Sequence, residues 1–413
     1  MAEALIIDAC RTPRGIGKQG KGSLAHLHPQ HLARTVLAAL VDRNGFDTAD
    51  VDDVIWGTSS QVCEQSGDLG RMAALDAGYD ITASGATLDR FCGSGITSAN
   101  YGAHAVMAGM EDLVVTGGTE MMSLPKKGLL PMGANNMHLQ AIHPQSHQGV
   151  CADAIASQEG IPREALDALA AESQRRAAVA IAEGRYDKSL IPVLNLDGTV
   201  ALDHEEFPRP QTTVESLAKL APSFPAVADY RHTEDSLTFR ELINQKYPDL
   251  VIEHVHHAGN SSGVVDGAAA LLMASEDYAK AHGLTPRARV VATANMGDDP
   301  TLMLNAPVPS ARKVLAKAGM TLDDIDLIEV NEAFAVVVEK FLRDLEVDRD
   351  KVNVNGGAIA LGHPIGATGA ILIGTVLDEL ERRDQQVGLV TMCAGGGMAP
   401  AIIIDRVERG GHV

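Results

Sequence analysis

The sequence predicts an α/β protein that consists of two similar halves with a different segment between them. The main evidence is an internal repeat, because Asp50-Val-Asp-Asp-Val-Ile is answered by Asp324-Ile-Asp-Leu-Ile-Glu at an offset of 274 (324 − 50). The helical stretch after Ala33 likewise has a counterpart after Ala311. In addition, strand-like apolar runs alternate with amphipathic stretches on both sides of the repeat, which is typical of layered α/β folds.

In the first half, residues 1–8 have the pattern of a buried strand, and residues 29–43 carry apolar side chains at helical spacing. The Asn44-Gly45 pair that follows is a typical helix stop. The remaining elements predicted in this half are a strand at 51–56, a helix at 68–77, a strand at 85–88, a helix at 96–110 and a strand at 113–116.

The second half repeats this order, with strands predicted at 352–354 and 388–392 and a helix at 366–380. The offset of 274 places Cys92 opposite position 366, at the start of that helix (92 + 274). Two halves of this kind would bring equivalent helix N-termini face to face across a pseudo-twofold axis.

The segment at 121–258 is richer in charge, His and Pro, with helices predicted at 150–159 and 162–183. It is interpreted as an excursion from the first half. A strand-like run at 266–273 then returns to that half.

Composition narrows the possible functions. The chain of 413 residues has only 3% aromatic residues but 40 Gly, which suits close-packed layers, and its net charge of −20 argues against nucleic acid or an anionic membrane as a partner. No apolar run reaches the roughly 18 residues of a membrane span, and the N-terminus does not resemble a signal peptide. Five scattered cysteines without a Cys-x-x-Cys pair favour reduced thiols and a cytoplasmic protein over disulfides or structural zinc.

Cys92 lies in the turn between the predicted strand at 85–88 and the helix at 96–110. Backbone N–H groups are unpaired at a helix start, and the helix dipole adds roughly +0.5 of a charge there. Such a position lowers the pKa of a thiol from about 8.5 into the range of about 3.5–7.5, which makes it a nucleophile. The alternative is a small buried cysteine beside a tight turn.

Three loop segments of the second half are candidates to meet Cys92. His363 could accept the thiol proton, or it is an ordinary loop histidine. Cys393 could act as a second acid or base, since an ordinary thiol pKa lies near 8.5, or it is a packing residue. Asn331 could orient a water or a carbonyl, or it caps a helix. The glycines at 395–397 could present backbone N–H groups to an oxyanion.

These residues belong to a set of motifs that resembles the thiolase family. The motifs occur in order over nearly the whole chain: Cys92-Gly-Ser-Gly, Gly117-Gly-x-Glu-x-Met-Ser, Ala258-Gly-Asn-x-Ser-Gly, Asn331-Glu-Ala-Phe, Asn355-Gly-Gly-Ala-Ile-Ala-Leu-Gly-His-Pro-Ile-Gly and Cys393-x-Gly-Gly-Gly. The resemblance implies a layered αβαβα sandwich of two α/β halves with an inserted loop domain. The domains expected are an N-terminal half at 1–122 and 259–276, a loop domain at 123–258 and a C-terminal half at 277–413.

The resemblance also implies a two-step acyl transfer. Cys92 would become acylated, and His363 would activate it and hydrogen-bond the thioester oxygen. Cys393 would protonate or deprotonate the acetyl-CoA carbon. Asn331 would hold a water that completes one oxyanion hole, and the backbone N–H groups of Cys92 and Gly395 would form the second. Because C–C cleavage next to a thioester passes through an enolate, negative charge on oxygen must be stabilised.

Coenzyme A would act as substrate and product, with no permanently bound cofactor and no metal. The segment 207–224 resembles the nucleotide-binding segment of the family, where Arg209 would meet the adenine end and Ser216 and Ser262 the adenosine and pantetheine portions. The alternative for Arg209 is a solvated surface charge. Further coenzyme A contacts are expected from His147, Ala333 and Phe334.

The chain departs from the family pattern around the expected acyl pocket. Gln148 stands where a methionine is usual, and the loop before it is short, which favours an acyl group larger than acetyl. Met303 matches a methionine that narrows the pocket in short-chain members. Cys151 is interpreted as a packing residue. An insertion at 225–255 leads into His254-Val-His-His, interpreted as solvated rather than metal-binding.

The function expected is reversible exchange between 3-ketoacyl-CoA plus CoA and acyl-CoA plus acetyl-CoA, in fatty-acid or related acyl-CoA degradation. The alternatives are an acetoacetyl-CoA-forming acetyltransferase, a ketoacyl-synthase-type enzyme, which would lack the second cysteine, and a non-catalytic acyl-CoA-binding subunit. A homodimer is expected in preference to a homotetramer.

Overall fold

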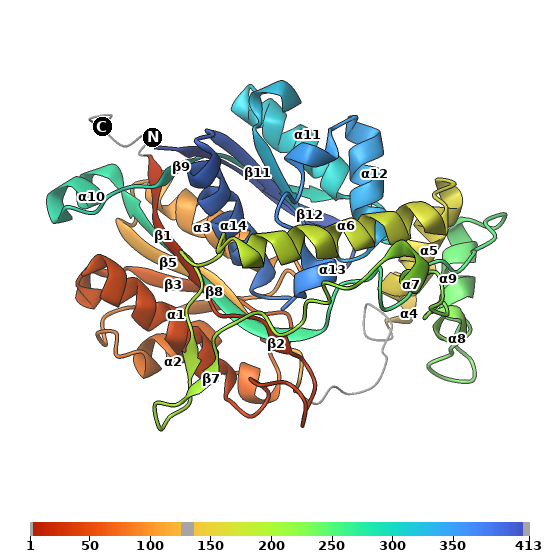
Figure 1. Ribbon diagram of the computed structural model, residues 1–413, viewed down its shortest axis with the longest axis horizontal. Coiled ribbons are helices and arrows are strands. Elements are labelled where there is room, and N and C mark those ends of the chain that lie inside the picture. Colours follow the sequence, from red (N-terminus) through yellow and green to blue (C-terminus); the bar gives the residue numbers. More distant parts are fainter. Residues whose placement is uncertain (1–2, 125–135, 408–413) are drawn as a thin grey trace.

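The computed structural model describes residues 3–124 and 136–407, which form a mixed sheet in the order β10-β11-β12-β9-β1-β8-β5-β3-β4, with β2 paired to β8 (Figure 1). Its strands are β1 (Ala4–Arg11), β2 (Gly15–Ile16), β3 (Asp53–Gly57), β4 (Ala86–Leu88), β5 (Leu113–Met121), β8 (Val265–Ser275), β9 (Ala288–Gly297), β10 (Leu327–Val330), β11 (Val387–Thr391) and β12 (Met398–Arg406). A separate ribbon pairs β6 (Val193–Leu194) with β7 (Val200–Leu202).

This sheet is two half-sheets joined at one seam. β1 and β9 pair only through Leu5 with Arg289 and Ile6 with Ala288. In the first half-sheet β5, β3 and β4 are parallel, and β8 runs antiparallel to both β5 and β1. In the second, β10 and β11 are parallel, and β12 runs antiparallel to both β11 and β9. Apart from β4, which has no counterpart strand among the described residues of the second half, the two half-sheets therefore have the same topology.

The helices divide into layers around these half-sheets (Figure 1). Helices α1 (Pro29–Asn44) and α2 (Leu69–Asp76) share an apolar core with the outer face of the first half-sheet. Helices α11 (Pro307–Ala318) and α12 (Ala335–Leu345) do the same for the second. Helices α3 (Ser94–Met107) and α14 (Thr368–Arg383) form a central core with strands of both halves. The predicted αβαβα sandwich is confirmed.

The pseudo-twofold axis passes between the starts of α3 and α14. Gly95 and Gly369, which the repeat makes equivalent, pack directly against each other's helix. A Cβ atom added at Gly369 would lie 2.1 Å from the backbone N of Ile96, and one added at Gly95 would lie 2.8 Å from that of Ala370. The predicted face-to-face helix N-termini are thus observed, and glycine permits their close approach.

The excursion packs mainly against the second half, where α5, α6, α9 and α12 share one core (Figure 1). The other helices are α4 (Met137–Ile142), α5 (Gln148–Gln158), α6 (Arg163–Ala182), α7 (Val214–Leu217), α8 (Pro225–Ala228), α9 (Phe239–Lys246), α10 (Glu276–His282) and α13 (Ala358–Leu361), with short 3-10 turns at Thr48–Asp50, Cys63–Gln65, Leu322–Asp324 and Arg349–Lys351. Afterwards β8 completes the first half-sheet. The domain boundaries given above stay a prediction, and part of the short loop before Gln148 lies outside the described residues.

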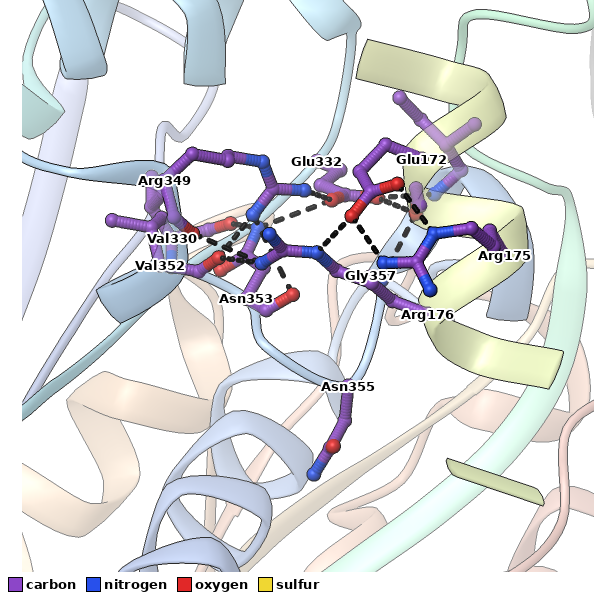
Figure 2. A network of polar contacts seen from close by, with 12 residues as sticks. Glu172, Arg175, Arg176, Val330, Glu332, Arg349, Val352, Asn353, Asn355 and Gly357 are labelled. Atoms are coloured by element: carbon purple, nitrogen blue, oxygen red, sulfur yellow. Dashed lines mark hydrogen bonds and ion pairs between the residues drawn. The ribbon is translucent and has the colours of Figure 1, made fainter. Parts of the chain in front are cut away.

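The strand predicted at 352–354 is wrong. Only a single bridge joins Val352 to Ile328. Asn353 takes a positive φ of 47°, and its side-chain amide binds both the N–H and the carbonyl of Val330 at 2.8 Å. The side chain of Asn353 thus replaces the ladder that a continued strand would form (Figure 2).

The histidine segment is not solvated, contrary to the prediction. His256 and His257 are buried. The Nδ1 of His256 lies 2.8 Å from Asp153, and the Nε2 of His257 lies 2.8 Å from Asp167. Because these carboxylates on α5 and α6 each bind one ring nitrogen, the segment is packed into the protein.

Candidate active site

Cys92 immediately precedes Gly93, the N-cap of α3, and is half-buried. Ser94 closes this turn, because its hydroxyl accepts a hydrogen bond from the N–H of Arg90 at 2.9 Å and donates one to the carbonyl of Phe91 at 2.7 Å. Phe91 has a positive φ of 50°. Cys92 therefore lies at the expected position between strand and helix. The Ser94 hydroxyl holds the backbone of this turn in place.

Cys393 follows β11 and is buried beside Cys92. Burial raises the pKa of the Cys393 thiol well above its usual range, and negative charge on Cys92 raises it further. Cys393 therefore stays a neutral thiol, able to donate a proton near Cys92.

His363 lies in the loop between α13 and α14 and is buried. Its backbone N–H donates to the carbonyl of Gly263 at 2.9 Å. Its Nδ1 lies 2.6 Å from the hydroxyl of Thr368, and that hydroxyl donates to the carbonyl of Pro364 at 2.9 Å. With the hydroxyl proton on the Pro364 carbonyl, Nδ1 donates to the Thr368 oxygen, and Nε2 is the ring nitrogen that can accept a proton.

Asn331 is the first residue after β10, and its N–H donates to the carbonyl of Thr391 at 3.2 Å. Its side chain is buried, and within the described part of the chain neither amide atom has a hydrogen-bond partner. Such a group is costly unless it serves a ligand or water. Asn331 thus stands ready to bind a further polar group.

The neighbouring Glu332 anchors this strand end in a polar network (Figure 2). Its carboxylate accepts hydrogen bonds from the Ser173 hydroxyl at 2.6 Å, the Ile359 N–H at 3.2 Å and the Asn353 amide at 3.2 Å. Arg349 lies 3.5 Å away. Glu332 therefore ties β10 to α6 and to the loop that leads to His363, and so fixes where Asn331 lies.

One pocket gathers many of the predicted residues. It encloses about 590 Å³, part of it open to solvent, and is lined by Ser59, Phe91, Cys92, Ser146, His147, Gln148, Met303, Ile365 and Gly395. Of these, Cys92, Gly395, His147, Gln148 and Met303 were predicted from sequence. Cys393 lies beside Cys92, and His363 precedes the lining residue Ile365 by two positions.

Sequence reasoning missed the lining residues Ser59, Phe91, Ser146 and Ile365. Ser59 is held by Glu120, whose carboxylate accepts from its N–H at 2.9 Å and its hydroxyl at 2.8 Å. The same carboxylate accepts from the N–H of Gly366 at 2.9 Å. Glu120 belongs to the Gly-Gly-x-Glu motif, so that motif was a signal for this link between the two halves.

Gln148 is exposed at the pocket, whereas Met303 is buried. The Gln148 amide is therefore not buried in the pocket, because the side chain reaches solvent. Cys151 is buried, with its Sγ 3.3 Å from the carbonyl of Thr301, in agreement with a packing role.

The residues predicted to bind coenzyme A flank the turn at 258–263. The N–H of Ser262 donates to the carbonyl of Ala333 at 2.9 Å. The ring of Phe334 stands edge-on to Phe224, 6.0 Å between centroids, and the half-buried His147 ring lies 5.8 Å from the same Phe224. Burial lowers the pKa of His147, so its ring is neutral near pH 7.

Arg209 and Ser216 lie on segments that border the same turn. The exposed guanidinium of Arg209 lies 5.8 Å from the centroid of the Phe207 ring, which packs against Gly263. Ser216 is exposed and its hydroxyl donates to the carbonyl of Thr213 at 2.7 Å, as part of the capping box of α7. Arg209 presents a cation to solvent, while the Ser216 hydroxyl already serves the helix start.

No helix within residues 3–124 and 136–407 is long and apolar enough to cross a membrane. Over the same ranges, no group of three or more His, Cys, Asp or Glu side chains is placed to hold a metal ion. The five cysteines are present as thiols rather than disulfides.

Comparisons with known proteins agree with the geometry. Residues 4–228 match the thiolase N-terminal domain and residues 284–406 the thiolase C-terminal domain. A steroid 3-ketoacyl-CoA thiolase of Mycobacterium tuberculosis is 39% identical over 98% of this chain and 95% of its own length. An acetyl-CoA acetyltransferase of Escherichia coli is 38% identical over 99% of this chain and 100% of its own. The crystal structure of the Bacillus anthracis acetyl-CoA acetyltransferase, 33% identical, superposes with a TM-score of 0.84 over 98% of this chain and 99% of that one.

Proposed function

The chain belongs to the thiolase family, and we propose that Cys92, His363, Cys393 and Asn331 carry out its chemistry. The protein is an acyltransferase that exchanges 3-ketoacyl-CoA plus CoA with acyl-CoA plus acetyl-CoA. The assignment of individual residues rests on the geometry described above.

In the cleavage direction, His363 Nε2 takes the proton of the Cys92 thiol, and the thiolate attacks the keto carbon of the substrate. The C–C bond next to the thioester then breaks, and its electron pair leaves as the enolate of acetyl-CoA. Cys393 donates its proton to the enolate carbon and becomes a thiolate. That thiolate takes the proton of incoming CoA, whose sulfur attacks the acyl-Cys92 thioester and releases the Cys92 thiolate. Cys92 then takes its proton back from His363.

The negative oxygens formed in these steps need hydrogen-bond donors. The buried, unpartnered amide of Asn331 supports a role in one oxyanion hole, with a water and His363. The backbone N–H groups of Cys92 and Gly395, two residues that line the same pocket, are the proposed donors of the second.

The observation that carries the proposal is the buried thiol of Cys393 beside Cys92. A Cys–His hydrolase or a ketoacyl-synthase-type enzyme needs no second thiol there. Cys393→Ala should therefore lower kcat for thiolytic cleavage at least about 100-fold, the usual size of acid–base catalysis. Cys10→Ala is the matched control, because Cys10 is also a buried thiol but lies in the outer core of the first half. Equal rates for the two variants would refute the role of Cys393.

We propose that coenzyme A binds along the turn at 258–263, with the exposed cation of Arg209 near its phosphates or adenine, and His147, Ser262, Ala333 and Phe334 beside pantetheine. In a protein of net charge −20, a local cation suits a multiply anionic ligand. Because the Ser216 hydroxyl already caps α7, Arg209→Ala should raise KM for CoA more than Ser216→Ala.

The acyl group is proposed to be larger than acetyl, as in degradation of longer 3-ketoacyl-CoA substrates. The exposed Gln148 lies at the Cys92 pocket, and the lining includes the apolar side chains of Phe91 and Ile365. A second candidate, acetoacetyl-CoA formation, is favoured by Met303, which is buried in the same wall. The ratio of kcat/KM for a six-carbon substrate to that for acetoacetyl-CoA separates the two.

We also propose that the protein is a cytoplasmic dimer that pairs through its first half. β4 is the outermost strand of the first half-sheet, and the apolar side chains of Ile81, Phe91 and Tyr101 near it are exposed. An uncovered edge with exposed apolar groups is a common site of symmetric pairing. Sedimentation at micromolar concentration should give a dimer, and a stable monomer would refute this.

A further inference from the structure

A buried carboxyl group that the steps above do not use lies on β10, two residues before Asn331. Glu329 is 3% exposed, and its carboxyl makes no hydrogen bond to any residue that the structure describes. At the equivalent position of the first half, Ile55 packs in the central apolar core. Since burying an unpaired carboxyl is unfavourable, the packing of the sheet does not account for Glu329.

Glu329 and Asn331 face the same internal cavity. Ile328 and Val330 point into the outer core, so Glu329 lies on the opposite face of β10, toward α14. The cavity is bordered by Glu329, Asn331 and Thr368, among others, and has room for roughly one water molecule. Alternate residues along a strand are about 6.6–7 Å apart, so one water can bridge the two side chains, which make no direct hydrogen bond to each other.

Burial and the neighbouring carboxylates favour the neutral form of the Glu329 carboxyl. Burial raises the pKa of Glu329 well above its usual range, and the carboxylates of Glu332 and Glu379 raise it further, against the opposing effect of Arg349 and Arg14. The guanidinium of Arg14 is already engaged by Glu205 at 2.6 Å, and Tyr186, which also borders the cavity, donates its hydroxyl to the carbonyl of Asn355. A neutral carboxyl offers an O–H donor.

We propose that Glu329 is a positioning residue for Asn331: one water in the cavity accepts a hydrogen bond from the Glu329 carboxyl and donates one to the side-chain Oδ1 of Asn331. An amide has one acceptor end and one donor end, so anchoring Oδ1 leaves the Nδ2 protons for the oxyanion side. An ionised Glu329 would instead attract Nδ2 and reverse the amide. This inference rests on the proposed role of Asn331.

The test compares Glu329→Gln, which keeps a neutral donor at every pH, with Glu329→Leu, which imitates the apolar residue of the first half. Glu329→Gln should keep kcat for thiolytic cleavage within about 3-fold of the native value at pH 7. Glu329→Leu should lower kcat about 10- to 100-fold, the effect of leaving a polar group unpaired, with KM for CoA unchanged. Its thermal unfolding midpoint should not fall, because a buried apolar side chain replaces an unpaired polar one.

Two readouts separate positioning from a structural role. The alkaline limb of the native kcat–pH profile should move to higher pH in Glu329→Gln, because that residue cannot ionise. In an Asn331→Ala background, Glu329→Leu should change kcat less than about 2-fold, since the residue acts through Asn331. Native-like kcat in Glu329→Leu, an unmoved alkaline limb, or full additivity with Asn331→Ala would each overturn the inference. If Asn331→Ala itself has native kcat, the proposed role of Asn331 fails instead.

Discussion

The two helices that meet at the centre of the molecule, α3 and α14, begin with the same kind of residue, but the side chains of these residues bind different groups. Each has a hydroxyl side chain at its first residue, Ser94 in α3 and Thr368 in α14, and the repeat makes these two positions equivalent. Ser94 binds only the backbone of the turn that carries Cys92. Thr368 binds the backbone of Pro364 and also the imidazole of His363.

The loops before the two helices explain this difference. The first half runs directly from β4 into the Cys92 turn, whereas the second half inserts α13 before α14. A short turn fixes a nucleophile through the backbone itself. A histidine on a longer loop needs its ring fixed separately, and the equivalent hydroxyl does this. The same position thus holds the backbone of the Cys92 turn in one half and the side chain of His363 in the other.

The largest loss of stability is expected from a substitution at the contact between α3 and α14. Gly369→Ala would place a Cβ 2.1 Å from the backbone N of Ile96 and force the halves apart, at a cost of more than about 3 kcal/mol in the free energy of unfolding. Gly374→Ala on the same helix is the matched control, because its Cβ would lie 3.3 Å from the Ala9 side chain and alanine favours a helix, so its effect should stay within about 1 kcal/mol. Denaturant unfolding measures both, and similar midpoints would contradict the close approach.

In each half, the end of the first strand forms an ion pair with the segment at 121–258, and the two ion pairs differ in strength. Arg11, the last residue of β1, and Arg14 just beyond it each lie 2.6 Å from the buried carboxylate of Glu205. After β9, Asp299 lies 2.7 Å from Lys246, which is 46% exposed. Glu205→Gln should cost about 3–5 kcal/mol, because it leaves a buried cation unpaired. Lys246→Ala should cost about 0–1 kcal/mol.

The buried pair also predicts a pH dependence. Burial alone would raise the pKa of Glu205, but Arg11 and Arg14 outweigh it and lower that pKa to about 2. Since the unfolded value is about 4.3, the stabilisation is complete above about pH 5 and is lost as pH falls toward 2. Native stability should therefore drop in this range, while that of Glu205→Gln should change less. Parallel curves for the two proteins would contradict the ion pair.

A smaller effect is expected on kcat when the hydroxyl that binds the His363 ring is removed. Thr368→Val keeps the shape but removes the partner of Nδ1, and should lower kcat about 10- to 100-fold, the value of one hydrogen bond to a group that becomes charged. Thr368→Ser is the control and should retain most activity. Ser94→Ala, at the equivalent position, should act mainly on stability. If Thr368→Val retains native kcat, His363 does not depend on this contact.

The sequence predicted the layers and the pseudo-symmetry because strand and helix periods and a constant offset are local or repetitive signals. It also predicted five residues of the Cys92 pocket from motifs. It missed Ser146 and Ile365, which border the pocket only after folding. The 352–354 strand was wrong because the Asn353 side chain replaces the ladder. The burial of His256 depends on Asp153, 103 residues away, and no local pattern contains that pair.

The smallest effect is expected on substrate preference, from a substitution at the solvent-exposed side of the pocket. Gln148 is exposed there, so Gln148→Met should lower the ratio of kcat/KM for a six-carbon substrate to that for acetoacetyl-CoA by only about 2- to 5-fold, because one side chain at a pocket wall contributes about 1 kcal/mol. A native ratio well below one would reject the larger acyl group altogether.

The most direct test of the account is where the acyl group attaches. The native protein and Cys393→Ala are incubated briefly with acyl-CoA, and their peptides are mapped by mass spectrometry. Both should carry the acyl group on Cys92, and Cys92→Ala should carry none, because the turn before α3 supplies the nucleophile and Cys393 transfers protons without carrying the acyl group. Acylation of Cys393 or Cys151, or loss of the Cys92 adduct in Cys393→Ala, would contradict this division of roles.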